Sequence, residues 1–477
     1  MLPETLIRSL KGIKGFDEEA FVAVHGSGEQ ITSVRFNPGK IFSQSPVGNN
    51  QYSIFNVQMG KVPWCTNGYY LSERPSFTLD PLFHAGAYYV QDASSMFLEE
   101  ELKQTVDLSK PLKILDLCAA PGGKSTLVQS IISKESLLVS NEVIKTRVNI
   151  LEENITKWGA ANVIVTNNDP ADFQRLENYF DVIIVDAPCS GSGLFRKDPG
   201  AIGEWSENNV SICSRRQQRI LADVMPALKE GGVLIYSTCS YSKEEDEAIC
   251  DWLVNEFNAE SLRLQIAEGW GIIETESEKN LAWGYRFYPD KVRGEGFYIS
   301  AFRKKEEASG ESLEARGGWR EGSGKSKERA KKNDANKLTA VEIGILKPWL
   351  KDADNFFFIK QKEEVIAMPL HLEDELVTIQ NALYIKKAGV KMGTIIRDEL
   401  IPDHELALST IIDPSIRSVE ADKTMALQYL RLEEIKLAAL EKGWSLLTYK
   451  QLLLGWMKIL PNRVNNYYPK GWRILNK

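Results

Sequence analysis

The sequence has few of the residues that build metal centres or disulfide frameworks. It contains only four histidines and six cysteines among 477 residues, and no two cysteines have the C-x-x-C spacing. Structural zinc sites are built from clusters of these residue types, so we expect no metal site. Unpaired cysteines scattered through a long chain are typical of reduced thiols, which indicates a cytoplasmic protein.

Long hydrophobic runs are absent as well. No apolar stretch approaches the roughly 20 residues that a membrane-spanning helix needs. The start, MLPETLIRSLKG, lacks the apolar segment of a secretory signal. We therefore expect no membrane association. The hydrophobic content of 43% suffices for the cores of several domains, and the net charge of −7 argues against indiscriminate binding of nucleic acid while leaving room for a local basic face.

The composition divides the chain into four regions. Residues 1–110 are expected to form a mixed α+β accessory region. Residues 111–304 alternate between strand-like and helical patterns, which predicts a mostly parallel α/β sheet. Residues 305–337 are charged and rich in Gly and Ser, so they cannot bury a core and are expected to form a flexible linker. Residues 338–477 are predicted to form another folded unit.

The stretch Lys113–Lys124, KILDLCAAPGGK, is predicted to form a strand, a tight turn and the start of a helix. In open α/β sheets a nucleotide-like ligand binds at such a place, beside the free N–H groups of the helix. Gly122 and Gly123 lack side chains, so the backbone can touch the ligand. A complete P-loop and a G-x-G-x-x-G motif are both missing, which disfavours a phosphate-loop or nicotinamide site. A plain strand-to-helix turn is the alternative for this stretch alone.

Hydrophobic periodicity places further elements in the middle region. Apolar residues at spacings of three and four predict a helix over 144–158. Helices are also expected over 208–229 and 243–257. The pair Gly231-Gly232 is expected to turn the first of these into a strand over 233–237.

Every predicted strand in the first part of this region ends in an acidic residue, and the carboxyl ends of parallel strands share one crevice. An acid after the second strand can accept both ribose hydroxyls, and one after the third can meet an adenine amino group. Each acid alone could be a helix cap or a turn residue, but together they indicate an adenosine-containing ligand. The four acids are Asp116, Glu142, Asp169 and Asp186.

Two cysteines stand just beyond apolar strands, Cys189 in DAPCSGSG and Cys239 in YSTCS. We expect them to meet at the same crevice, where a thiolate can be exposed. Cys213 and Cys250 fall in helical patterns and are expected to be small buried hydrophobes. For Cys118, in the glycine-containing loop, the backbone is expected to matter more than the thiol.

A thiol beside an adenosine-type ligand suggests covalent catalysis on a pyrimidine base. A thiolate that adds to C6 makes C5 electron-rich enough to attack a sulfonium methyl group, and a base must then remove the C5 proton before the thiol leaves. Asp186 is placed to stabilise the adduct near the ring nitrogen. The target must leave its stack to reach the thiol, so a flipped or single-stranded nucleotide is expected. The residues alone do not say which cysteine is the nucleophile.

The C-terminal end is basic and aromatic, with no acidic residue after Glu441. Such interleaving suits phosphate contact combined with base stacking. It equally suits a solvated basic edge whose aromatic residues pack. A helix is expected over 424–442. The interleaved aromatic residues are Trp456, Tyr467, Tyr468 and Trp472.

Taken together, these motifs resemble the RNA cytosine-5 methyltransferases of the NOL1/NOP2/Sun family, and within it the bacterial RsmF branch that acts on ribosomal RNA. The resemblance rests on SVRFN, HAGAYYVQDASSM, ILDLCAAPGGKS, NEVIKTRVNILEENITKWG, FDVIIVDAPCSGSG and GGVLIYSTCSYSKEEDE, in this order over most of residues 30–303. A shorter and looser match, LGWMKILPNRVNNYYPKGWRI, resembles the PUA-like RNA-binding module at the end of that branch.

The resemblance implies a Rossmann-like, class I core that uses S-adenosylmethionine, with an RNA-facing N-terminal region and a β-rich PUA-like C-terminal domain. It assigns Cys239 as the nucleophile at C6 and Cys189 as the residue that assists product release, with Asp186 between cofactor and cytosine. Glu142 would bind the ribose hydroxyls and Asp169 the adenine side. The other implied cofactor contacts are Cys118, Ala119, Ala120, Pro121, Gly122, Gly123, Lys124 and Arg147.

The reaction implied by this family is methylation of C5 of one cytidine in small-subunit (16S) ribosomal RNA, and we expect the enzyme to be a monomer. Two alternatives stay open: the same reaction on transfer RNA, and a silent assembly factor that only binds ribosomal RNA. A DNA cytosine methyltransferase is disfavoured because the matched segments follow the order of the RNA family.

Overall fold

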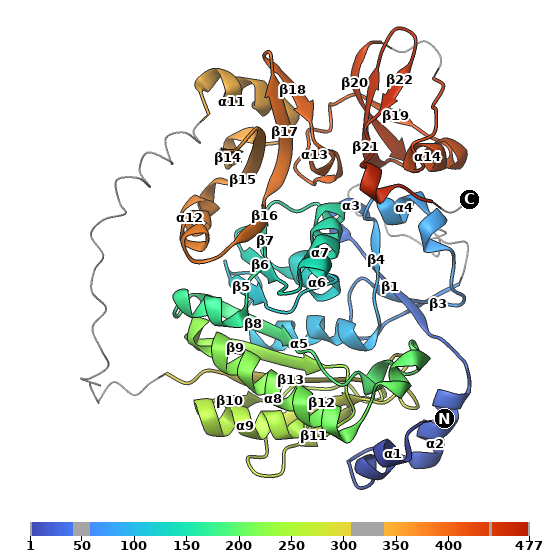
Figure 1. Cartoon of the computed structure of the whole chain (residues 1–477), viewed down its shortest axis with the longest axis vertical. Helices are drawn as coiled ribbons and strands as arrows, with labels where there is room; N and C mark the ends of the chain where they lie inside the picture. Colours follow the sequence, from blue (N-terminus) through green and yellow to red (C-terminus); the bar gives the residue numbers. More distant parts are fainter. Residues whose placement is uncertain (1, 42–57, 307–337, 438–440, 476–477) are drawn as a thin grey trace, which may run out of the picture. The chain divides into compact units, whose positions relative to one another are not determined.

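The chain forms two compact units in a computed structural model that describes residues 2–41, 58–306, 338–437 and 441–475 (Figure 1). Most of the expected linker, 305–337, therefore lies outside the described residues. The first unit comprises Met1–Trp158, Asn162–Lys305 and Glu375–Lys387, and the second comprises Gly159–Ala161, Glu306–Asp374 and Ala388–Lys477.

The first unit is built around a ten-stranded sheet whose central strands are parallel. Their spatial order is β7-β6-β5-β8-β9, so the chain order reverses beside β5. Open parallel sheets bind ligands at such a reversal, outside the carboxyl ends of the strands. The predicted parallel α/β core is confirmed. Its central strands are β5 (Lys113–Asp116), β6 (Leu137–Asn141), β7 (Val163–Thr166), β8 (Phe180–Asp186) and β9 (Leu228–Thr238).

Both edges of this sheet carry additional strands. Next to β9, β13 runs antiparallel and pairs with β12 and β10, and β11 forms the outermost strand. At the opposite edge, β16 follows β7 although it comes from far along the chain. These strands are β10 (Glu260–Leu262), β11 (Ile273–Glu276), β12 (Trp283–Phe287), β13 (Phe297–Arg303) and β16 (Ile385–Ala388).

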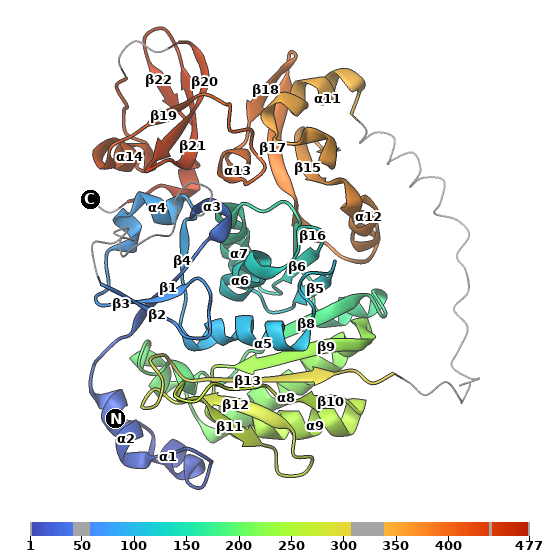
Figure 2. The ribbon, with the colours of Figure 1, turned by 180° about the vertical axis from the view of Figure 1, so that it is seen from behind.

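Two groups of helices flank the sheet (Figure 2). Helix α6 contacts both α5 and α7, and α8 contacts α9. The central strands are therefore buried, which explains their continuous apolar sequences. The bounds of these helices, and of α12 in the segment from later in the chain, are α5 (Leu98–Thr105), α6 (Gly123–Ile131), α7 (Lys145–Trp158), α8 (Glu207–Val224), α9 (Glu247–Phe257) and α12 (Glu373–Ala382).

The boundary between α8 and β9 differs from the sequence prediction. The helix expected over 208–229 ends at Val224, and a short 3₁₀ turn, Met225–Ala227, follows it. Pro226 cannot donate a backbone hydrogen bond and ends the helix. Strand β9 then begins at Leu228 and continues through the two glycines that were expected to form a turn. Helix α9 likewise begins at Glu247, four residues later than predicted.

The N-terminal region adds a separate four-stranded sheet of order β2-β3-β1-β4. Arg35 on β1 is only 1% exposed and donates hydrogen bonds to the Gly123 carbonyl and the Thr126 hydroxyl of α6. Arg35 thus braces the helix that follows the predicted cofactor loop. The elements are α1 (Glu4–Leu10), α2 (Glu18–Gly26), β1 (Thr32–Phe36), α3 (Pro38–Ile41), β2 (Met59–Lys61), β3 (Gly68–Leu71), α4 (Pro81–His84) and β4 (Tyr88–Val90).

The second unit contains two four-stranded sheets, β14-β15-β17-β18 and β19-β20-β21-β22. The helix expected over 424–442 is shorter than predicted, because α14 ends at Leu430 and Leu432 takes a left-handed conformation. The elements are α11 (Ala340–Leu346), β14 (Phe356–Gln361), β15 (Glu364–Pro369), β17 (Val390–Ile396), β18 (Glu399–Pro402), α13 (His404–Leu408), β19 (Ser418–Glu420), α14 (Lys423–Leu430), β20 (Gly443–Tyr449), β21 (Leu452–Ile459) and β22 (Val464–Asn466).

Two of the aromatic residues in the basic C-terminal end pack inside this unit. Trp456 is 0% exposed and its Nε1 donates to the Asp403 carbonyl at 2.8 Å, and Tyr468 is 3% exposed. They cannot stack on a nucleic-acid base, whereas Tyr467 is 38% exposed. In the part of the chain that the structure describes, no helix has the length and apolar character to cross a bilayer.

Candidate active site

The glycine-containing loop joins β5 to α6 as predicted. Gly122 has a φ of 115°, in the left-handed region that a residue with a side chain rarely adopts. A Cβ added at Gly123 would lie 3.3 Å from the Tyr89 ring, so the start of α6 has little room for a side chain. Burial raises the pKa of the Cys118 thiol, which keeps its proton.

Two side chains outside the loop donate hydrogen bonds to its carbonyls. The Arg147 Nη2 donates to the Ala120 carbonyl at 2.7 Å, and the Asn154 Nδ2 donates to the Pro121 carbonyl at 2.8 Å. Both side chains belong to α7, which begins four residues after the end of β6. Arg147 therefore contacts the loop directly, in addition to lying 3.5 Å from a carboxylate oxygen of Glu142.

Asp116, at the end of β5, is a fully buried carboxyl group beneath the loop. Its Oδ2 accepts a hydrogen bond from the Ser125 hydroxyl at 2.6 Å. Its Oδ1 is buried and has no hydrogen-bond partner among the described residues. Burial raises the pKa of Asp116 to about 7, and the Ser125 hydrogen bond opposes this rise.

Glu142 and Asp169 follow the next two strands, and both also act as local caps. One Glu142 oxygen accepts a hydrogen bond from the Ile144 amide at 2.9 Å. Asp169 accepts one from the Ala171 amide at 3.1 Å and begins a 3₁₀ helix with a capping box. Each acid therefore has the cap or turn role that was the alternative to ligand binding. These backbone hydrogen bonds also fix both carboxylates at the carboxyl edge of the sheet.

The segment Glu375–Lys387 reaches the end of β7 next to Asp169. The Asn168 amide group donates to the Tyr384 carbonyl and accepts from the Tyr384 amide, both at 2.9 Å. This segment lies inside the range 338–477 that was expected to form the C-terminal module, but it belongs to the first compact unit. A distant part of the chain thus helps to order the predicted adenine end of the site.

Cys189 and Cys239 come from the ends of neighbouring parallel strands. Strand β8 ends at Asp186, which pairs with Ser237 near the end of β9, so the chain beyond each strand enters the same space. The two Sγ atoms lie 2.9 Å apart, and both side chains are half-buried. The prediction that these thiols meet is confirmed.

The environment of Cys189 favours a protonated thiol. The hydrogen bond with the Cys239 sulfur and the burial of the side chain raise the pKa of Cys189 well above its ordinary value. A thiol that keeps its proton can serve as a proton donor. By contrast, Cys213 and Cys250 are buried on α8 and α9, as their helical spacing predicted.

Asp186 links the thiols to the cofactor loop. Its Oδ2 lies 2.8 Å from the Lys124 Nζ in the first turn of α6, and its Oδ1 accepts a hydrogen bond from the Ser237 hydroxyl at 2.8 Å. The side chain remains 36% exposed, so the carboxylate is accessible to a ligand. The Lys124 ammonium also lies 5.0 Å from the centre of the Phe297 ring.

Sequence reasoning did not identify Glu245, Ser190 and Ser240 as parts of this site. Glu245 lies in an acidic run that was expected to begin a charged helix, yet its side chain is 0% exposed and lies between the two cysteine loops. Only the tertiary structure distinguishes it from its exposed neighbour Glu244. Among the described residues, no three His, Cys, Asp or Glu side chains form a group that could hold a metal ion.

The residues around the loop fit S-adenosylmethionine. A polar ligand can satisfy the buried Oδ1 of Asp116, which has no partner among the described residues, and the glycines leave the backbone open to close approach. Lys124, Glu142 and Asp169 add charged groups around the same edge of the sheet. A cofactor with an amino acid part, a ribose and an adenine needs such a mixed set of donors and acceptors.

Three known protein families match segments of the chain. The family described as 16S rRNA methyltransferase RsmB/F matches residues 103–303. The N-terminal domain of 16S rRNA methyltransferase RsmF matches residues 2–93, and the methyltransferase RsmF PUA domain matches residues 416–474.

Several curated relatives and solved structures resemble the chain. The Ribosomal RNA small subunit methyltransferase F of Aliivibrio fischeri is 30% identical over 419 residues, which cover 86% of this chain and 84% of the relative. The protein of the same name from Shewanella woodyi is 29% identical over a match that covers 92% of this chain and 89% of the relative. The crystal structure of a methyltransferase homologue from Pyrococcus horikoshii is 28% identical with a TM-score of 0.52, covering 63% of this chain and 93% of that chain.

NSun6 from Pyrococcus horikoshii, solved with SFG, shares the fold with a TM-score of 0.53 at 19% identity, over 64% of this chain and 99% of that chain. The sequence matches, the parallel sheet with its loop after β5 and the PUA domain lead to one conclusion. The chain belongs to the RsmF-type 16S rRNA methyltransferases, a group of S-adenosylmethionine-dependent enzymes within the RsmB/F family.

Proposed function

We propose that the protein methylates C5 of a cytidine in small-subunit ribosomal RNA through a covalent bond between Cys239 and C6. One observation carries this proposal: the Sγ atoms of Cys189 and Cys239 lie 2.9 Å apart, beyond the same strand ends as Asp186. A cytosine base that enters this space can meet a nucleophile and a second thiol together.

The covalent step follows from the chemistry of the pyrimidine ring. The Cys239 thiolate forms a bond to C6, and the electron pair of the C5–C6 double bond makes C5 nucleophilic. S-adenosylmethionine supplies an electrophilic methyl group for this carbon. After C5 has gained the methyl group, a base must accept the C5 proton, so that the C5–C6 double bond forms again and the Cys239 sulfur leaves C6.

Cys189 and Asp186 have different roles in this proposal. The Cys189 thiol keeps its proton next to the Cys239 sulfur, so it can protonate the leaving sulfur and assist release. Asp186 is exposed enough to meet the ring nitrogen of the bound cytosine and is held by Lys124 and Ser237. A carboxyl group at this position can stabilise the adduct through a hydrogen bond.

We propose that the cofactor lies along Cys118–Lys124, with its ribose at Glu142 and its adenine at Asp169. Arg147 supports the loop through the Ala120 carbonyl. We also propose that the four regions inferred from the sequence act together in a cytoplasmic monomer. In it the N-terminal region and the PUA domain bind RNA, and exposed Tyr467 is one candidate contact.

The test measures transfer of a labelled methyl group to 16S rRNA, to assembled small subunits and to transfer RNA. We expect the wild-type protein to label a cytidine of 16S rRNA, located by bisulfite sequencing, and Cys239→Ala to abolish labelling. Cys213→Ala, which changes a buried cysteine on α8, is the matched control and should retain activity. Labelling of transfer RNA alone would favour that alternative, and no labelling by the folded wild-type protein would favour a non-catalytic assembly factor.

A further inference from the structure

A single buried carboxylate connects the two loops that carry the thiols. Glu245 lies in the turn between β9 and α9 and is 0% exposed. Its Oε1 accepts hydrogen bonds from the Ser190 amide at 2.8 Å and the Gln217 Nε2 at 3.1 Å. Its Oε2 accepts hydrogen bonds from the Ser190 hydroxyl at 2.5 Å and the Ser240 hydroxyl at 2.7 Å.

The partners of Glu245 are the residues that directly follow the two thiols. Ser190 follows Cys189, and Ser240 follows Cys239. One carboxylate thus contacts the chain one residue beyond each sulfur atom. All four of its hydrogen-bond partners act as donors, and an ionised carboxylate can accept from all of them at once.

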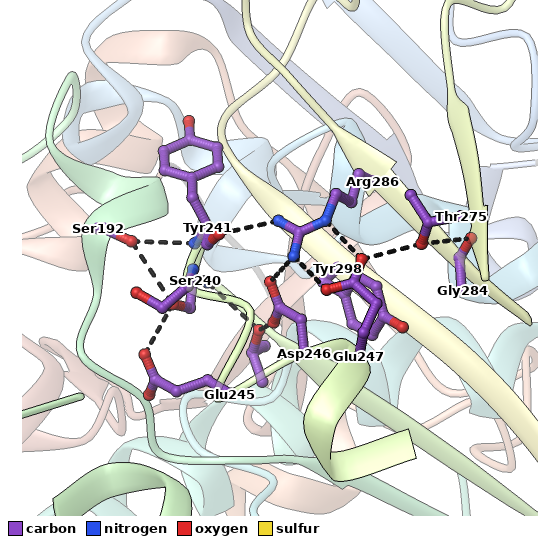
Figure 3. A network of polar contacts seen from close by, with 12 residues as sticks. Ser192, Ser240, Tyr241, Glu245, Asp246, Glu247, Thr275, Gly284, Arg286 and Tyr298 are labelled. Carbon is purple, nitrogen blue, oxygen red and sulfur yellow. Dashed lines mark hydrogen bonds and ion pairs between the residues drawn. The ribbon is translucent and has the colours of Figure 1, made fainter. Parts of the chain in front are cut away.

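A second contact joins the same loops on the other side of the serines. The Ser192 hydroxyl accepts a hydrogen bond from the Tyr241 amide at 2.9 Å, and the Gly193 amide donates to the Cys239 carbonyl at 2.9 Å. A Cβ added at Gly193 would lie 2.8 Å from that carbonyl oxygen, so the loops are packed backbone to backbone. Figure 3 shows Ser192, Ser240 and Glu245 as one connected chain of polar groups.

The turn that carries Glu245 is itself anchored to the sheet. The Tyr236 hydroxyl donates to the Glu245 carbonyl at 2.6 Å. Arg286 on β12 donates to the Tyr241 carbonyl at 2.9 Å and forms ion pairs with Asp246 at 3.0 Å and Glu247 at 2.5 Å, as Figure 3 shows. The carboxylate is therefore a fixed point, and the cysteine loops are held against it.

We propose that Glu245 is a positioning residue that sets the separation of the Cys189 and Cys239 sulfur atoms. Its hydrogen bonds to Ser190 and Ser240 prevent the two loops from moving apart when a base enters between them. The consequence for RNA methylation rests on the proposed function, but the control of the distance between the sulfur atoms does not. A small displacement of reacting groups can cost about 100-fold in rate.

The experiment compares Glu245→Ala with Glu244→Ala, an exposed neighbour in the same turn. The rate of disulfide formation between Cys189 and Cys239 under diamide reports their proximity without any RNA. The two thiols are oxidised and the diazene is reduced to a hydrazine, and peptide mass spectrometry identifies the bond. We expect Glu245→Ala to slow this reaction about 10-fold or more, and Glu244→Ala to match the wild type.

Methylation kinetics give the second measurement. We expect Glu245→Ala to lower kcat about 100-fold with little change in KM for RNA or in affinity for S-adenosylmethionine. Glu245→Gln should recover part of the lost rate, since its amide can still bridge Ser190 and Ser240. A merely structural role would instead lower cofactor affinity and thermal stability in proportion to activity.

Two outcomes would overturn the proposal. One is a Glu245→Ala protein that forms the disulfide as fast as Glu244→Ala. The other is an equal kcat for these two variants. If Glu245→Ala does not fold, the same measurements are made on Ser190→Ala and Ser240→Ala. Wild-type rates of disulfide formation and methylation in both variants would reject the proposed role of Glu245. A wild-type protein that methylates no RNA would refute the proposed function, while the disulfide rates would still decide the role of Glu245.

Discussion

The cofactor side and the thiol side of the site are built in opposite ways. On the cofactor side, Asp116 keeps a buried oxygen without a hydrogen-bond partner among the described residues, and Glu142 accepts one hydrogen bond, from a nearby amide, and lies 3.5 Å from the Arg147 guanidinium. On the thiol side, the Glu245 carboxylate accepts four. On the cofactor side, carboxyl oxygens can still accept hydrogen bonds from a ligand. On the thiol side, the hydrogen bonds of the carboxylate instead fix the positions of the two loops.

This difference separates two kinds of buried charge. A carboxylate that is already saturated by donors fixes its surroundings and gains nothing from a ligand. A carboxyl group with a free oxygen is costly to bury until a ligand supplies the missing donor. Substitutions on the cofactor side should therefore act mainly on binding, and those on the thiol side mainly on the rate of the chemical step.

After the loss of activity expected for Cys239→Ala, the largest effect is expected for Cys189→Ala, which removes the second thiol while leaving the nucleophile. We predict that a covalent protein–RNA adduct accumulates and that turnover falls by about 10² to 10⁴-fold, the usual contribution of a proton-transfer group. A slowly migrating band on a denaturing gel measures the adduct. The double variant Cys189→Ala/Cys239→Ala should show no such band, and an adduct there would mean that another residue is the nucleophile.

A smaller effect is expected for Glu142→Ala on the cofactor side. Loss of a charge-assisted hydrogen bond worth about 1.5–3 kcal/mol should weaken binding of S-adenosylmethionine by roughly 10- to 100-fold. Titration calorimetry measures this affinity. Glu135→Ala removes an exposed acid just before the other end of β6 and is the matched control. Equal affinity in the two variants would remove Glu142 from the ribose site.

Asp116 should make stability depend on pH in a direction opposite to that of most paired carboxylates. Burial raises its pKa from 3.8 to about 7, so between these values the folded protein binds more protons than the unfolded chain. The free energy of unfolding should then fall as pH rises from about 4 to 7. Urea unfolding across this range should show a shallower fall for Asp116→Asn, by at most about 1.4 kcal/mol per pH unit. Identical slopes in both proteins would contradict the assignment.

The smallest effect is expected where the segment Glu375–Lys387 meets β7. Asn168→Ala removes two hydrogen bonds to the Tyr384 backbone and should lower the free energy of unfolding by about 1–2 kcal/mol. Tyr384→Ala keeps these bonds and changes a side chain that is 64% exposed, so its effect should stay within about 0.5 kcal/mol. Equal stability of both variants would show that the segment does not support the first unit.

Local patterns predicted much of the architecture. The apolar run at the start of KILDLCAAPGGK predicted β5, because strands buried on both faces must be continuously apolar. The predicted helix over 208–229 extends beyond the end of α8 at Val224. The prediction ignored Pro226, which cannot donate the next backbone hydrogen bond of the helix. The short α14 has no comparably clear sequence signal.

The sequence by itself determined that Cys189 and Cys239 meet, since both follow strands of one parallel sheet and such strands end at the same edge. Only the tertiary structure decided what holds them there. Glu244 and Glu245 look alike in sequence, yet one is exposed and the other is fully buried between two loops. The distinction depends on contacts with Ser190 and Gln217, which lie far away in the chain. Periodicity describes only neighbours along a helix or strand, so it carries no information about such contacts.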